Sequence, residues 1–213
     1  MAILPVHNQA GQQVGTYDLD FNEIALSINK QLLHDVVVMY EANQRVGTAR
    51  SRSRGEIAGS TKKLYKQKGT GRARMGPKRT PIRRGGGHAF RKVARDWGYR
   101  LPKKAIRLAT RMALLSKFQD NQVTVLNSWD VTAPKTKVVA AALKGLGLSE
   151  KSCLLATDAH NPILWKSSRN IPEIEVYPAA DLNAYVLLRQ RQLVVTTAAL
   201  DVLRKPVAET ASE

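Results

Sequence analysis

The chain has 213 residues, with 34 Lys and Arg against 17 Asp and Glu, a formal net charge of +17. Hydrophobic residues make up 43%, which excludes a wholly disordered protein, and the single cysteine excludes an internal disulfide or a cysteine-based zinc site. The longest apolar runs are far shorter than the ~20 residues of a membrane span, and no secretory signal is expected. The charge favours a polyanionic partner, nucleic acid first and an anionic membrane surface second.

The first 44 residues are expected to form two short strands and one helix. Apolar residues predict strands over 3–6 and 14–17, separated by polar and glycine residues. Asp20 and Glu23 then have the spacing of a capping box, with Asp in the position usually held by Ser or Thr. Apolar residues recur at helical spacing after this box, and they predict one helix over about 24–43.

The positive charge is concentrated in one segment. Residues 45–111 hold 22 Lys and Arg but only two acids, Glu56 and Asp96, a net charge of +20. The remainder holds 12 bases and 15 acids, a net charge of −3, and ten of the 14 glycines lie between Gly47 and Gly98. The chain is therefore a nearly neutral body interrupted by an intensely basic insert.

Residues 45–100 are predicted to form a long extended loop. Their large apolar residues are few and follow neither helical nor strand spacing. Ordering a backbone costs roughly 1–2 kcal/mol per residue, which so little apolar surface cannot offset. Long structureless loops in compact domains are usually functional or disordered, so we expect this one to be ordered by its polyanion.

A helix is predicted to leave the loop, because Pro102 is well tolerated in a first helical turn. One face of this helix is apolar and is expected to be buried: Leu101, Ala105, Leu108, Met112 and Leu115. Another face is basic: Lys103, Lys104, Arg107 and Arg111. Its continuity with the basic loop favours phosphate contact over the alternative, a merely solvated basic face.

Strands and helices alternate through the rest of the chain. Strands are predicted at 123–126, 153–157, 173–177 and 193–197, and helices at 135–146, 161–168, 182–188 and 198–205. This order is typical of βαβ units, in which helices cover both faces of a parallel sheet.

The predicted fold class is therefore α/β. We expect a single globular domain with a mainly parallel sheet flanked by helices, interrupted by the long extended basic loop. The predicted divisions are 1–44 with 101–205 for the globular body, 45–100 for the loop and 206–213 for a flexible tail.

Catalytic and cofactor chemistry finds little support. Gly69-Thr70-Gly71 resembles the start of a dinucleotide-binding loop, but the third glycine of that motif would stand at position 74, which is Arg74. The Gly-Lys-Ser/Thr that ends a phosphate-binding loop does not follow either. The four histidines lie far apart without metal-ligand spacing, so neither a metal nor a cofactor nor a small-molecule substrate is predicted.

One enzymatic alternative stays open at Asp158 and His160, which follow a predicted parallel strand. The preferred interpretation is that Asp158 caps a turn or the next helix, and that Cys153 is a small buried apolar residue. A third alternative is a basic protein that binds membrane surfaces or acts like a chaperone.

Four aromatic residues accompany the basic loop: Tyr65, Phe90, Trp97 and Tyr99. Aromatic rings among Arg and Lys can stack on unpaired bases while the cations hold phosphates. Phe90, Trp97 and Tyr99 can equally pack the loop onto the body, whereas lysines surround Tyr65 and argue against a core position for it.

A family resemblance rests on the motif Lys66-Gln67-Lys68-Gly69-Thr70-Gly71-Arg72-Ala73-Arg74, followed by Pro81 and Arg84-Gly85-Gly86-Gly87. The chain resembles the family of universal large-subunit ribosomal protein four, of the bacterial or organellar type. Matching segments extend over nearly the whole chain: 43–48, Arg54-Gly55-Glu56, Leu101-Pro102-Lys103-Lys104 and 133–137.

The resemblance implies a structural, non-enzymatic constituent of the large ribosomal subunit that supports subunit assembly and translation. Its loop is expected to thread through large-subunit rRNA and to reach the constriction of the nascent-peptide exit tunnel. The implied partners are this rRNA, ribosomal protein twenty-two and other large-subunit proteins, and the nascent peptide, with no membrane. The implied location is the ribosome of the cytoplasm, with an organellar matrix or stroma left open. Some bacterial members also repress their own operon through mRNA, a role that this sequence leaves open.

The resemblance and the charge pattern together give the expected contact residues. The expected tunnel tip comprises Lys63, Leu64, Tyr65, Lys66, Gln67, Lys68 and Gly69. The expected rRNA-binding residues are Arg50, Arg52, Arg54, Lys62, Lys63, Lys66, Lys68, Arg72, Arg74, Lys78, Arg79, Arg83, Arg84, Arg91, Lys92, Lys103, Lys104, Arg107 and Arg111. The chain departs from the family pattern at Leu64-Tyr65, where Pro-Trp is common, and at Arg91-Lys92-Val93-Ala94, where many members have Gly-Pro-x-Pro.

Overall fold

The computed structural model describes residues 2–204 and divides into two units. The body comprises the chain up to Tyr40 and from Arg100 onward, and the arm comprises Glu41–Tyr99. The domain boundaries expected from the sequence lie within a few residues of this division and stay a prediction. The predicted tail, 206–213, lies outside the described residues.

The body is built on one six-stranded sheet with the order β2-β1-β3-β6-β4-β5. Only the β1–β2 hairpin is antiparallel, and the other neighbouring pairs are parallel. The strands are β1 Ala2–His7, β2 Gln13–Leu19, β3 Val123–Leu126, β4 Cys153–Thr157, β5 Ile174–Pro178 and β6 Gln192–Thr196. The predicted α/β fold with a mainly parallel sheet is confirmed.

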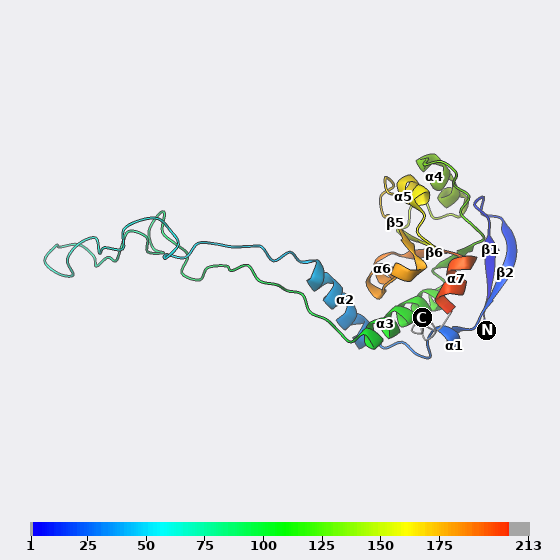
Figure 1. Cartoon of the computed structure of the whole chain (residues 1–213), viewed down its shortest axis with the longest axis horizontal. Coiled ribbons are helices and arrows are strands. Elements are labelled where there is room, and N and C mark those ends of the chain that lie inside the picture. Colours follow the sequence, from blue (N-terminus) through cyan, green and yellow to red (C-terminus); the bar gives the residue numbers. More distant parts are fainter. Residues whose placement is uncertain (1, 205–213) are drawn as a thin grey trace, which may run out of the picture. The chain divides into compact units, whose positions relative to one another are not determined.

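Helices lie on both faces of this sheet (Figure 1). They are α1 Phe21–Ile24, α2 Lys30–Gln44, α3 Lys103–Gln119, α4 Thr136–Gly145, α5 Pro162–Ser168, the 3-10 turn η1 Ala179–Asp181, α6 Ala184–Arg189 and α7 Thr197–Arg204. No helix within residues 2–204 is long and apolar enough to cross a membrane.

Alternating side chains of the central strands supply two hydrophobic cores. Along β4, Leu154 belongs to the core under α3, α6 and α7, while Leu155 belongs to the core under α4 and α5. Successive residues of a strand point to opposite faces, so one apolar strand serves both layers. Every fully buried apolar side chain of the described residues belongs to the body rather than to the arm.

The single helix expected over 24–43 is wrong, because two caps divide the segment. The Asp20 carboxylate accepts a hydrogen bond from the Asn22 amide at 3.2 Å and begins α1, which lasts one turn. Ala25 then has extended backbone, with φ −159° and ψ 149°. The Asn29 side chain accepts from the Leu32 amide at 3.2 Å and begins α2, as N-cap residues do.

The apolar face expected along α3 is wrong at Leu108, whose side chain is 44% exposed. The C-terminal half of α3 is buried on nearly all sides, with Ala109, Met112 and Ala113 starting the buried stretch. Leu108 precedes the part of the helix that the core covers. The helical spacing of apolar residues was therefore predicted correctly, but the buried stretch begins later than expected.

Candidate nucleic-acid interface

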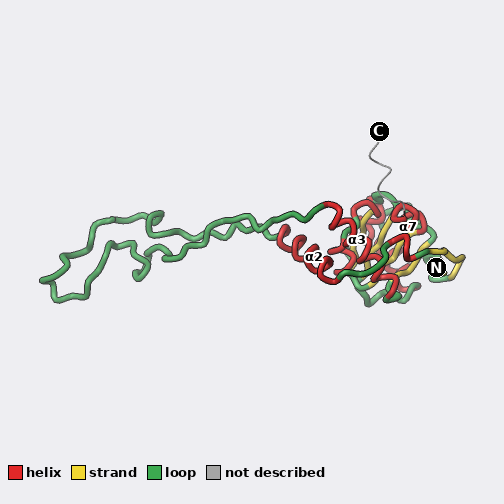
Figure 2. Tube along the Cα trace, turned by 90° about the horizontal axis from the view of Figure 1, so that it is seen from below, coloured by secondary structure: helices red, strands yellow, loops and turns green. Residues whose placement is uncertain are grey.

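The arm from residue 45 to Tyr99 contains no helix and no named strand, only two isolated bridges, Ser53–His88 and Lys63–Pro77. Its outgoing and returning segments run side by side in both views of the chain (Figures 1 and 2). The arm is therefore a folded-back loop whose shape depends on contacts between these two segments.

Part of the arm, which we call the nodule, is held by its own backbone; it comprises residues 50–57 and 77–92. The His88 amide donates to the Arg52 carbonyl at 2.9 Å, and the Ser51 amide donates to the Lys92 carbonyl at 3.0 Å. Gly87 is buried where the two segments cross, and a Cβ there would lie 2.2 Å from the Arg54 nitrogen. Only glycine allows so close a crossing.

Glu56 joins the two segments of the nodule electrostatically. Its carboxylate accepts hydrogen bonds from the Arg91 guanidinium, from the Ser53 amide at 3.1 Å and from the Arg50 guanidinium at 3.0 Å. These donors, Arg91 first, lower the pKa of Glu56 to about 2. One carboxylate thus bridges two arginines that would otherwise repel each other across the arm.

The nodule departs from the expectation that a polyanion alone orders the loop. Its contacts join residues up to 41 positions apart, such as Lys92 and Ser51, without any apolar core. Hydrogen bonds and a central carboxylate supply the order that apolar side chains supply elsewhere.

A second group of contacts closes the base of the arm around Trp97. Arg45 and Arg95 lie over the Trp97 ring, with their guanidinium carbons 3.9 and 3.4 Å from its centroid. The Arg95 amide donates to the Gly47 carbonyl at 3.2 Å. The ring of Trp97 is thus engaged by arginines of the arm itself, an arrangement that neither sequence-based alternative for this aromatic anticipated.

The other aromatic residues of the arm differ in exposure. Phe90 is 99% exposed and Tyr99 is 44% exposed. Tyr65 is half-buried, and its hydroxyl donates to the Ala73 carbonyl on the returning segment. Phe90 is therefore the aromatic side chain of the arm most available for stacking on a base.

At the expected tip, the lysines differ in their partners. The Lys63 ammonium donates to the Gln67 side chain. Lys66 and Lys68 are exposed and have no hydrogen-bond or acid partner among residues 2–204.

Most of the expected rRNA-binding cations of the arm are exposed, and their charged groups meet no acid or hydrogen-bond acceptor on the described residues: Arg52, Arg54, Lys62, Lys66, Lys68, Arg72, Arg74, Lys78, Arg84 and Lys92. Arg50 and Arg91 are instead bound to Glu56, and Arg79 and Arg83 are half-buried. On α3, Lys103, Lys104 and Arg107 are exposed while Arg111 is half-buried. Most cations of the arm are therefore free to bind an anion, while a few hold the two segments of the nodule together.

Cys153 lies at the opposite end of β4 from Asp158 and His160, the residues of the enzymatic alternative. Asp158 and His160 are exposed just beyond the end of β4, whereas Cys153 is buried at its beginning. Burial raises the pKa of the Cys153 thiol to about 11, which fits the predicted buried apolar residue rather than a nucleophile. Asn161, not Asp158, caps α5, with its side chain accepting from the Ile163 and Leu164 amides at 3.1 and 3.0 Å. Within residues 2–204, no three His, Cys, Asp or Glu side chains are placed to hold a metal ion.

Comparison with known proteins adds evidence from the whole chain. A family model described as the ribosomal protein L4/L1 family matches residues 18–206. The chain is 49% identical to the large ribosomal subunit protein uL4 of Rhodopirellula baltica over 201 residues, covering 94% of this chain and 90% of that protein. It is 42% identical to the proteins of the same name from Caldicellulosiruptor bescii and Moorella thermoacetica, covering 92% of this chain and 94% of each relative.

Proposed function

The chain belongs to the ribosomal protein L4/L1 family, and on that basis we propose that it is a structural constituent of the large ribosomal subunit whose arm binds ribosomal RNA. Membership in this family confirms the prediction that the chain is not an enzyme. The proposed partners are large-subunit rRNA and neighbouring ribosomal proteins, and the proposed location is the ribosome of the cytoplasm.

The observation that carries the proposal is the row of unpaired cations along the arm. An arm whose cations lack internal partners gains the most when phosphates replace their counterions. The guanidinium and ammonium groups of the described arm are mostly exposed, and its few acids cannot neutralise them. The basic face of α3, with Lys103, Lys104, Arg107 and Arg111, extends the proposed RNA contact along the chain.

We further propose that residues 63–69 line the nascent-peptide exit tunnel, with ribosomal protein twenty-two as a neighbour there. The motif from Lys66 to Arg74 supports this assignment, and so does the exposure of Lys66 and Lys68. The half-buried Tyr65 acts in this proposal as a brace for the tip, because its hydroxyl bonds to Ala73 across the loop.

Deletion of residues 54–95 tests the role of the arm. The body keeps all of the fully buried apolar side chains of the described chain, so the shortened protein is expected to fold and melt cooperatively. Its incorporation into large subunits is expected to be lost, measured by the amount of the protein in purified subunits at physiological salt.

The matched control for this deletion is the double variant Asp158→Asn, His160→Ala, which should assemble and support translation normally. Normal incorporation of the shortened chain would contradict the proposed role of the arm. Loss of translation in the double variant despite normal assembly would favour chemistry at the edge of β4 instead.

A further inference from the structure

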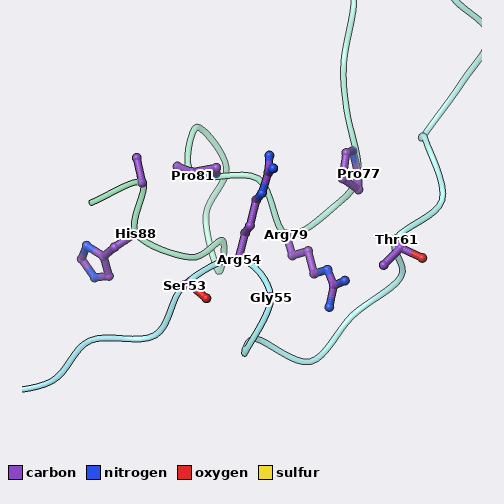
Figure 3. A pocket seen from close by; sticks show the side chains of 9 residues that line it. Ser53, Arg54, Gly55, Thr61, Pro77, Arg79, Pro81 and His88 are labelled. Atoms are coloured by element: carbon purple, nitrogen blue, oxygen red, sulfur yellow. The ribbon is translucent and has the colours of Figure 1, made fainter. Parts of the chain in front are cut away.

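The nodule, together with the neighbouring Thr61, surrounds a hollow that is open to solvent (Figure 3). The cavity has a volume of about 740 Å³, within the range of small-ligand sites. Its walls include charged, hydroxyl and proline side chains from both segments: Ser53, Arg54, Thr61, Pro77, Arg79 and Pro81. The hollow therefore belongs to the arm alone.

Two guanidinium groups give this hollow its charge. In Figure 3 the Arg54 side chain extends between Pro81 and Pro77, while Arg79 extends toward the stretch from Gly55 to Thr61. Arg79 is fixed there, because its guanidinium donates to the Ile57 carbonyl at 3.3 Å. Arg54 is exposed and has no partner among the described residues.

No acid competes for these two arginines. Glu56 does not line the hollow, and its carboxylate is engaged by Arg50, Arg91 and the Ser53 amide. The same contacts hold the walls in place, so an anion would enter a site that is already assembled. Such preorganisation lowers the ordering cost of binding.

The remaining walls suit the other parts of a nucleotide. Proline rings offer flat apolar surfaces, and the hydroxyls of Ser53 and Thr61 have no hydrogen-bond partner among residues 2–204. Sequence-specific RNA recognition usually targets unpaired bases that leave the stack and pack on side chains.

We propose that the hollow of the nodule receives a single unpaired nucleotide of large-subunit rRNA, with its phosphate on Arg54 and its base against Pro77 and Pro81. This rests on the proposed function and sharpens it. The exposed cations of the arm bind phosphate wherever it lies, whereas the hollow fixes the register of the arm on the RNA.

Nucleotide-resolution footprinting of large-subunit rRNA bound to the full chain tests this inference. Arg54→Gln and Arg72→Gln are matched variants, because each removes one exposed guanidinium that has no partner on the described residues. Both are expected to reduce the log–log salt slope of binding by about one. Arg54→Gln alone is expected to lose protection at one unpaired nucleotide.

Arg54→Lys is a second variant, which keeps the positive charge but loses the bidentate hydrogen-bond donor of the guanidinium. It should restore the wild-type salt slope, but protection of the nucleotide should stay incomplete. Identical footprints for wild type, Arg54→Gln and Arg54→Lys would overturn the pocket while leaving rRNA binding by the arm intact. Failure of the wild-type chain to bind rRNA would instead overturn the proposed function, and the pocket with it.

Discussion

At the scale of single residues, position rather than charge decides what an ionisable group does. Glu56 is an acid inside the most basic part of the chain, and it holds Arg50 and Arg91 together. Lys117 is a base in the body, yet it is buried and donates to the Gln122 side chain and to the Gln190 carbonyl at 2.7 and 2.8 Å. Burial lowers the pKa of Lys117, and its role is to join α3 to the turn before β6 rather than to contact RNA.

The depressed pKa of Glu56 predicts how the nodule responds to acid. A carboxyl group with a lowered pKa contributes stability above its ordinary value of 4.5, and that stability is lost as pH falls through about 2. The Ser53 amide, which donates to Glu56, is therefore expected to shift in NMR spectra with a midpoint near pH 2.

The Glu56→Gln variant provides the control, since its Ser53 amide should show no midpoint in this range. A wild-type midpoint near 4.5 would mean that Arg91 and Arg50 do not engage the carboxylate in solution.

At the scale of elements, the sequence predicted what short-range patterns can reveal. The bounds of β3 and β4 were predicted to the residue, because each is a compact run of apolar side chains. The single helix predicted over 24–43 was wrong because the Asn29 cap starts a new helix there. The helical spacing of apolar residues continues across this break, so the spacing alone does not reveal it.

The nodule escaped prediction for a different reason. Several of its contacts join residues 35 to 41 positions apart, such as Arg91 with Glu56 and Lys92 with Ser51, and no periodic pattern in the sequence indicates them. Of the candidate site, the free cations were visible in the sequence. The hollow beside Arg54 was not, because it exists only once distant segments cross.

Glycine substitutions in the arm test whether this crossing holds the nodule. In Gly87→Ala the new Cβ would lie 2.2 Å from the Arg54 nitrogen, so the crossing must open and weaken the bond from the His88 amide to Arg52. Overpacking of this kind costs about 1–3 kcal/mol, so we expect amide exchange at His88 to accelerate about 5- to 150-fold in the free chain.

Gly55→Ala is the matched control, because its Cβ would meet only the Ser53 hydroxyl, 3.6 Å away. Exchange at His88 should stay unchanged in that variant. Equal protection in both variants would show that the two segments do not cross closely in solution.

At the scale of the whole molecule, the chain separates folding from charge. The body holds the apolar cores, and the arm holds most of the unpaired cations. This separation lets the arm carry a charge that a compact core could not contain, since like charges placed close together oppose folding.

The salt dependence of rRNA binding measures how the two units share the contact. If about 10 phosphates are neutralised, the log–log slope for the full chain is expected to be roughly −7 to −9. Without residues 54–95, six of the expected rRNA-binding residues remain, and they would give a slope of roughly −4 to −5: Arg50, Arg52 and the four bases of α3. Filter binding over a series of salt concentrations checks both values, and equal slopes would place the phosphate contacts on the body.

The strand order of the sheet also sets a sequence of events during synthesis. Strand β1 pairs with β3, and β6 occupies the middle of the sheet, so the body needs residues made long after the arm. At ~5–20 residues per second, the stretch from Tyr99 to Thr196 takes roughly 5–20 s to make. The contacts of the nodule all lie within residues 50–92, so they can form during that interval. In a newly made chain, the proposed RNA-binding surface can thus take shape before the domain that carries it.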